Sequence, residues 1–211
     1  MAVSSVPGPQ GRTLPSEEEV RQVVAAVLAG IETEELERGP VGSSEDERAP
    51  EPVAAEVAVG ADHGGYRLKE RIAADLRERG YEVHDCGTDS TEPVDYPDFA
   101  HEVARLVADG ACRWGIVVDG AGIGSCMAAN KVPGIRAATC WDLTSAKNSR
   151  EHNHANVLVL GAGLIGENLA LEIVRAWMLM PWGGERHARR VEKIMDIERR
   201  YLVHAEAGAI A

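Results

Sequence analysis

Short apolar runs alternate with amphipathic segments along most of this chain. The apolar runs, each bounded by Gly or polar residues, predict strands at 57–61, 81–85, 115–118, 135–140 and 157–160. Segments with helical periodicity follow them at 66–79, 94–108, 125–131, 142–151 and 167–180, and a last helix rich in Arg and Lys is expected at about 185–202. Five strand–helix units in succession are typical of a parallel sheet covered on both faces. We therefore expect an α/β, Rossmann-like three-layer domain with a five-stranded parallel sheet over residues 56–203, and a C-terminal tail at 204–211.

The pattern before residue 56 is different. Residues 1–15 are rich in Pro, Gly and Ser and are expected to be disordered, whereas Ser16 and Glu19 form a capping box that opens an amphipathic helix over 16–31. Its apolar face consists of Val20, Val23, Val24, Val27, Leu28 and Ile31. Residues 32–55 have the composition of an acidic linker. The helix either packs on its own domain or dimer partner, or docks into a larger assembly, as cargo-targeting peptides of bacterial microcompartments do.

Charge and cysteine usage exclude several classes of protein. The net charge is −12, and residues 1–56 carry 12 acidic and only 4 basic residues. With no basic stripe and 4% aromatic residues, nucleic-acid binding has little support. Cys86, Cys112, Cys126 and Cys140 lie too far apart for a CxxC metal or redox pair, so we expect reduced, mostly buried thiols and no metal site. Without an apolar run long enough for a membrane helix, we expect a soluble cytoplasmic protein, with the interior of a microcompartment as the alternative location.

The segment 114–136 carries the clearest chemical signal. It reads as a buried strand, a glycine turn (Gly120-Ala121-Gly122-Ile123-Gly124) and the first turn of a helix, so its backbone N–H groups point at one spot suited to an anion. Asp119, an acid, stands at the tip of that strand. Because it precedes the helix predicted to begin near Ser125 by six residues, an ordinary N-cap role is not expected, and we interpret Asp119 as a proton-transferring base.

Other polar groups follow neighbouring strands. Asp62 and His63 follow the first strand, and His152 stands at the end of the fourth helix, where a histidine is also favoured by the helix dipole alone. Because ligands bind at the carboxyl ends of parallel strands, these loops are expected to converge. Arg186 and Arg190, four residues apart, either clamp a phosphate or belong to a solvated basic face.

In order and spacing, these motifs resemble the ribose-5-phosphate isomerase B family, which includes the galactose-6-phosphate isomerase subunits. The resemblance covers about residues 57–202 and rests on the runs Gly60–Gly65, Asp95-Tyr96-Pro97, Gly120–Gly124, Ala128–Arg136, Ser149–Asn153 and Arg186–Arg190. It implies a cofactor-free aldose–ketose isomerase of a sugar phosphate, acting through a cis-enediolate, with its active site at a homodimer or tetramer interface. The pentose phosphate pathway is the metabolic setting that it suggests.

The resemblance also implies roles for individual residues. Asp62, His63 and Tyr96 would contact substrate, the turn from Gly120 to Gly124 would cradle the enediolate oxygens, and His152 with its neighbour Asn153 would open the sugar ring. Arg186 and Arg190 would hold the phosphate.

Two departures from the family pattern bear on the chemistry. Most relatives carry Cys at the position of Asp119 as the base, another branch uses Glu at the position of Ser125, and the residue usually Thr in the turn is Ala121 here. A carboxylate is a legitimate base for moving a proton between neighbouring carbons. The substrate can then be ribose 5-phosphate or another four- to six-carbon sugar phosphate.

Two other kinds of protein fit part of this pattern. A nicotinamide dehydrogenase would fit Gly120-x-Gly122 with Asp142 about 20 residues on. However, Ser125 stands at the third glycine position, and the helix that follows is short. A P-loop at Gly60–Gly65 would need a Lys-Ser or Lys-Thr pair directly after it, which the sequence lacks. A non-catalytic sugar-phosphate-binding or regulatory homologue would fit the loss of Cys and Thr. Asp119 and His152, which binding alone does not require, favour the enzyme.

Overall fold

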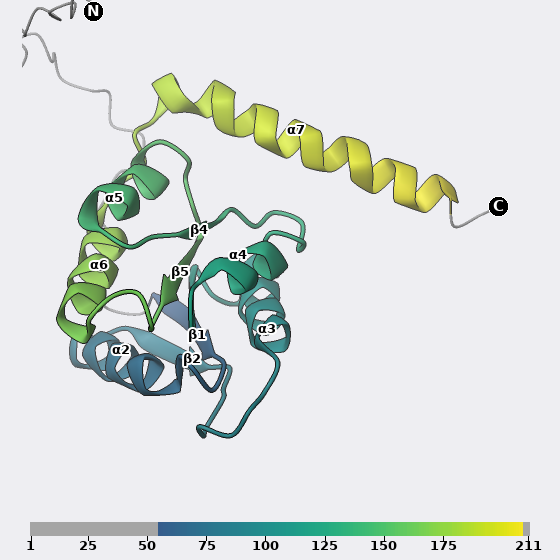
Figure 1. Cartoon of the computed structure of the whole chain (residues 1–211). Helices are drawn as coiled ribbons and strands as arrows, with labels where there is room; N and C mark the ends of the chain where they lie inside the picture. The colour runs from purple at the N-terminus through teal and green to yellow at the C-terminus, as the bar shows by residue number, and fades with distance from the viewer. Residues whose placement is uncertain (1–54, 209–211) are drawn as a thin grey trace, which may run out of the picture. The chain divides into compact units, whose positions relative to one another are not determined.

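The computed structural model of the protein describes residues 55–208, with side chains up to residue 202 (Figure 1). The strands are β1 (Glu56–Ala61), β2 (Glu82–Asp85), β3 (Trp114–Asp119), β4 (Ala137–Thr139) and β5 (Val157–Gly161). The helices are α2 (Tyr66–Glu78), α3 (Tyr96–Ala108), α4 (Ile123–Ala129), α5 (Leu143–Glu151), α6 (Glu167–Leu179) and α7 (Glu185–Gly208). The disordered segment, amphipathic helix and linker predicted before residue 55 lie outside the described residues.

The predicted five-stranded parallel sheet is confirmed. Its strand order is β2-β1-β3-β5-β4, and every pairing is parallel. From β1 the chain moves to β2 on one side and later to β3 on the other, so the order reverses between β1 and β3. In open α/β sheets ligands bind outside the carboxyl ends of the strands at such a switch point. Ala61 and Asp119, the last residues of β1 and β3, flank it.

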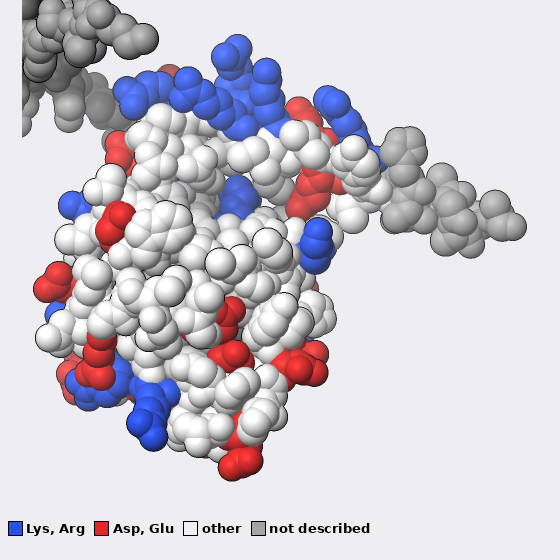
Figure 2. Space-filling view, viewed as in Figure 1, with Lys and Arg blue, Asp and Glu red and all other residues white. Residues whose placement is uncertain are grey.

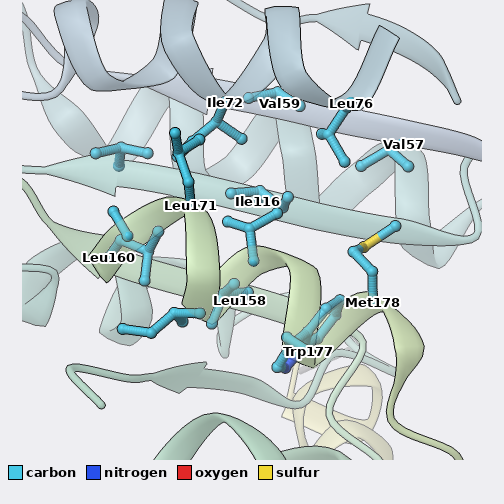
Figure 3. Close-up of a cluster of buried hydrophobic side chains, with 14 of the residues drawn as sticks. Val57, Val59, Ile72, Leu76, Ile116, Leu158, Leu160, Leu171, Trp177 and Met178 are labelled. Atoms are coloured by element: carbon cyan, nitrogen blue, oxygen red, sulfur yellow. The ribbon is translucent and has the colours of Figure 1, made fainter. Parts of the chain in front are cut away.

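Apolar side chains from the strands alternate between two cores, one on each face of the sheet. On the face covered by α2 and α6, Ile116 and Leu158 pack with Ile72, Leu76 and Trp177, as Figure 3 shows. The other face carries a second cluster in which strand residues pack with α3; it includes Ala58, Val117, Val159, Ala100, Val103 and Ala104. All residues of β3 and β5 are buried, which explains why these strands read as continuous apolar runs.

The element bounds differ from the predicted ones mainly at two places. Helix α4 begins at Ile123 instead of Ser125, because Gly122 adopts φ +75° and turns the chain into the helix two residues earlier. Helix α7 continues to Gly208, whereas the sequence pattern ended it near residue 202.

The four cysteines are unpaired, with Cys112 and Cys140 buried and Cys86 and Cys126 partly so, as expected. Within residues 55–208, no helix combines the length and apolarity that crossing a bilayer requires.

Candidate active site

The loop after β1 lies directly against the glycine turn after β3. Asp62 is buried, and its Oδ1 accepts the N–H of Gly65 at 2.9 Å. A Cβ on Gly65 would come within 2.1 Å of the Val118 carbonyl oxygen, and one on Gly64 would lie 3.5 Å from the Gly120 nitrogen. The two glycines therefore allow the first loop to approach the turn that holds Asp119, as the sequence predicted for this pair of loops.

Asp119 points its carboxylate back into its own turn. Its Oδ1 accepts the N–H groups of Ala121, at 2.8 Å, and of Gly122, and its Oδ2 accepts the N–H of Ser125 at 3.1 Å. The side chain is only 5% exposed. The amides of the glycine turn therefore do converge on a negative group, and that group is the carboxylate of Asp119 itself.

This geometry corrects the expectation that Asp119 takes no part in capping. The helix begins at Ile123, two residues earlier than predicted, and Gly122 folds the turn back, so an acid six residues before Ser125 still reaches its amide. Three N–H groups that would otherwise lack partners at the start of α4 are satisfied in this way.

The loop after β5 supports the same turn, although sequence reasoning assigned none of its residues a role. Ala162 and Gly163 donate their N–H groups to the carbonyls of Asp119 and Gly120 at 2.8 and 2.9 Å. Thr139, at the end of β4, donates its hydroxyl to the Gly122 carbonyl at 2.7 Å. The glycines at 161 and 163 after an apolar strand were the available signal, since glycine there often marks a close backbone approach.

His63 and Tyr96 lie on the rim of this site. The exposed His63 ring places Nδ1 3.2 Å from both the N–H and the carbonyl oxygen of Val94, just before α3. Tyr96, 41% exposed at the start of α3, lies over Gly124, where a Cβ would come within 2.5 Å of the Tyr ring. His63 and Tyr96, which the resemblance implied as substrate contacts, therefore both border the turn. His63 does so through its position after Asp62, and Tyr96 through its contact with Gly124.

His152 belongs to a second cluster of rings, at the end of α5. Its ring stacks on that of His187 with centroids 4.2 Å apart, and its Nδ1 lies 2.7 Å from the Asn148 side-chain nitrogen. Burial, together with His152, Arg186 and Arg190, lowers the pKa of His187. The neutral ring that results can accept the N–H of Arg186, whose Nε lies 3.3 Å from His187 Nε2. Sequence reasoning missed His187, although it stands within the quoted Arg186–Arg190 run.

Asn153, Arg186 and Arg190 are all exposed. The Asn153 amide lies 3.3 Å from the Asn148 carbonyl, which keeps it next to His152. Figure 2 shows basic side chains gathered along α7, which carries both arginines. Within the described chain, the structure gives no contact between either arginine and the residues of the Asp119 turn.

One further polar atom at the turn has no assigned role. The Ser125 hydroxyl is fully buried and has no hydrogen-bond partner among the residues that the structure describes. Its neighbour in space, the Asp119 carboxylate, takes the Ser125 N–H instead.

Comparison with known proteins identifies the domain. A family model described as Ribose/Galactose Isomerase matches residues 57–194. Ribose-5-phosphate isomerase B of Escherichia coli is 49% identical over 144 residues, covering 68% of this chain and 97% of that protein. A D-erythrulose-4-phosphate isomerase of Pectobacterium atrosepticum is 45% identical over 140 residues, covering 65% of this chain and 91% of that protein.

Solved structures agree with this assignment. Ribose-5-phosphate isomerase B of Clostridium thermocellum superimposes with a TM-score of 0.69 at 53% identity, covering 69% of this chain and 99% of that one. The enzyme of Mycoplasma genitalium, solved with bound ribulose-5-phosphate, gives 0.67 at 35% identity, covering 70% and 98%. The chain therefore belongs to the ribose/galactose isomerase family, and it is an aldose–ketose isomerase of sugar phosphates of the ribose-5-phosphate isomerase B type.

Proposed function

We propose that the protein interconverts ribose 5-phosphate and ribulose 5-phosphate, or a related four- to six-carbon pair of sugar phosphates, with Asp119 as the base. The observation that carries the proposal is the carboxylate of Asp119 at the carboxyl end of β3, fixed among the amides of the glycine turn. The printed names of relatives point to two substrates, ribose 5-phosphate and D-erythrulose 4-phosphate. Assays with sugar phosphates of both lengths distinguish a four-carbon from a five-carbon substrate.

The hydrogen bonds indicate which oxygen of Asp119 acts. A carboxylate offers about four lone-pair positions, two on each oxygen. Oδ1 uses both of its positions on Ala121 and Gly122, whereas Oδ2 accepts, among the described residues, the N–H of Ser125 alone. Oδ2 then keeps one lone pair with which to take the proton from the carbon next to the substrate carbonyl and to return it to the neighbouring carbon.

The same hydrogen bonds indicate which backbone amides remain available to stabilise the enediolate. Since Ala121 and Gly122 already donate to Asp119, the amides of Ile123 and Gly124 at the start of α4 are the ones we assign to the developing oxyanion. The positive end of the helix adds to their effect. Tyr96, packed over Gly124, then borders the oxygen-binding position.

The remaining roles require a second subunit. Within residues 55–202, neither Arg186 nor Arg190 contacts the turn, and α7 exposes the apolar side chains of Ile194, Ile197 and Tyr201 at helical spacing. Such an exposed stripe marks an interaction surface. We assign it to a homodimer in which the arginines of one subunit hold the phosphate in the other subunit's site, while His152 opens the sugar ring.

A panel of aldose and ketose phosphates with four, five and six carbons, followed by NMR, tests this function. We expect interconversion of one pair at a rate well above that of the others, with exchange of the transferred hydrogen with solvent, as an enediolate requires. A wild-type protein that binds sugar phosphates but converts none of them would contradict the proposal.

A further inference from the structure

Three metal-ligating side chains meet at the edge of the sheet opposite the active site. Glu56 is the first residue of β1, His84 lies in β2 next to Ala58, and Cys112 immediately precedes Arg113 and β3. One possible ligand atom from each, a carboxylate oxygen, an imidazole nitrogen and the thiol sulfur, lie within 4.8 Å of one another. Because the three residues come from separate elements, no short sequence motif reveals them.

The imidazole of His84 provides a second observation. Its Nε2 lies 3.3 Å from Glu56 Oε2, but the geometry does not make a hydrogen bond, and this buried nitrogen has no hydrogen-bond partner among the residues that the structure describes. A buried ring nitrogen without a partner is costly, so it calls for a ligand.

The electrostatic surroundings favour a cation. The Glu56 carboxylate lies 3.3 Å from His84 Nε2, and its negative charge would stabilise a positive ion bound beside the imidazole. On coordination, a divalent metal takes the place of the thiol proton, which is released to solvent.

We propose that Glu56, His84 and Cys112 form a binding site for a divalent transition metal, with Zn²⁺ as the expected ion. A thiolate, an imidazole and a carboxylate together suit Zn²⁺ and not Mg²⁺ or Ca²⁺, which prefer oxygen ligands alone. Bonds of about 2.0–2.3 Å require the ligand atoms to move slightly closer. The Glu56 and His84 side chains, 41% and 39% exposed, can make that movement around the buried sulfur of Cys112.

Three protein ligands leave a fourth position for water. In this place, the ion would tie the edge strand β2 to β1 and to the start of β3, and we assign it a structural role at that corner of the sheet. The site is separate from the isomerase chemistry, since its ligands stand at the amino ends of β1 and β3 or within β2, and the Asp119 turn lies at the carboxyl end of β3.

The test uses the untagged full-length chain, stripped of metal with a chelator. Zn²⁺ is titrated against a chromophoric competitor, and Co²⁺ is added separately as a spectroscopic probe. The variants are His84→Ala and Cys112→Ala, and the matched controls are Glu82→Gln, which removes a nearby charge but no ligand, and Cys140→Ala, another buried thiol.

We expect one equivalent of Zn²⁺, a sulfur-to-cobalt charge-transfer band in the near ultraviolet, and a loss of affinity of at least about tenfold in either ligand variant. The two controls should stay within about threefold of the wild type, because screened charge and unrelated thiols contribute little. A wild type without the cobalt–sulfur band would overturn the proposal, whatever the variants do. Equal binding by wild type and Cys112→Ala would overturn it too, by placing the metal elsewhere, for example at the rings of His152 and His187.

Discussion

The Asp119 carboxylate accepts the backbone N–H of Ser125 at 3.1 Å, across six residues of chain, and thereby ties the tip of β3 to the first turn of α4. The group that we assign as the base is at the same time the cap of the helix that builds its site. Its position is thus fixed by main-chain geometry before substrate binds, which is the arrangement that preorganised catalysis requires.

The unpartnered hydroxyl of Ser125 leads to a stability prediction. Ser125→Ala removes a buried donor that makes no hydrogen bond in the described chain, so the free energy of unfolding should stay unchanged or rise by up to about 1 kcal/mol. Denaturant titration measures it. The matched variant is Ser149→Ala, because the Ser149 hydroxyl accepts the buried N–H of Trp177 at 3.0 Å, and its loss should cost about 1–3 kcal/mol. Equal destabilisation by the two variants would contradict this reading.

Lys69 leads to a prediction about pH. Burial lowers its pKa, but hydrogen bonds and charges from Asp85 and Glu70 outweigh burial, so the net pKa lies above its usual 10.5. A raised pKa in the folded state means that the stabilisation is complete below the unfolded pKa and is lost as pH rises through the folded one. The wild type should therefore lose stability as the pH rises above about 10.5.

Lys69→Met should be less stable than the wild type at pH 7 by roughly 1.5–3 kcal/mol, because it removes the charged donor of Asp85, which keeps the N–H of Gly87. It should also lack the alkaline loss of stability. Lys147→Met, at an exposed position of α5, serves as the control and should behave as the wild type in both respects. An alkaline transition that persists in Lys69→Met would show that another group causes it.

The sequence alone predicts more of the fold than of the candidate site. Alternating apolar runs and glycine boundaries predicted all five strands and the helices between them, because both patterns are local. The contacts that organise the site are not local: the aim of the Asp119 carboxylate depends on the φ of Gly122, and the stacking of His152 on His187 depends on how α7 meets α5. Neither can be obtained from residue spacing, and the wrong expectation about helix capping arose for that reason.

The phosphate role of Arg186 and Arg190 is tested by single replacement with Ala. Each replacement should raise KM for the phosphorylated sugar by at least roughly tenfold, as expected when a charge-assisted hydrogen bond of about 1.5 kcal/mol is lost. Arg189→Ala, one position away on the same helix, is the control and should leave KM unchanged. An unchanged KM in both arginine variants would place the phosphate elsewhere.

Complementation between two variants tests whether each active site combines residues of both subunits. If Arg186 serves the site of the partner subunit, a mixed dimer of Asp119→Asn and Arg186→Ala chains contains one site with both groups intact. Random mixing should then restore about a quarter of the wild-type kcat/KM, measured at substrate well below KM, since half of the dimers are mixed and each holds one complete site. Mixtures no more active than the separate variants would show that each chain uses its own arginines.

The N-terminal extension should be dispensable for fold and turnover. Deletion of residues 1–52 removes the predicted helix and nearly all of the acidic linker but leaves β1 whole. We expect unchanged kcat and oligomeric state, measured by NMR assay and light scattering, and a change only in assembly with other proteins or in location. A truncated chain that unfolds or dissociates would show that the apolar face of Val20, Val24, Val27 and Ile31 belongs to the structural core.

Asp119→Asn tests the central claim most directly, with Asp119→Cys as its matched comparison. Asn keeps one oxygen that can accept the amides of Ala121 and Gly122, whereas Cys loses all three hydrogen bonds to the turn, so the Cys variant should be the less stable, by on the order of 1 kcal/mol. Only the Cys variant keeps a group that can act as a base, the one that the family resemblance places here. The measurement is kcat for the best substrate of the wild type, with substrate affinity determined alongside.

If Asp119 is the base, kcat should fall at least ~100-fold in Asp119→Asn while substrate still binds nearly normally, and Asp119→Cys should retain clearly more activity. If Asp119→Asn isomerises its substrate at close to the wild-type rate, Asp119 only caps α4, and the base lies elsewhere.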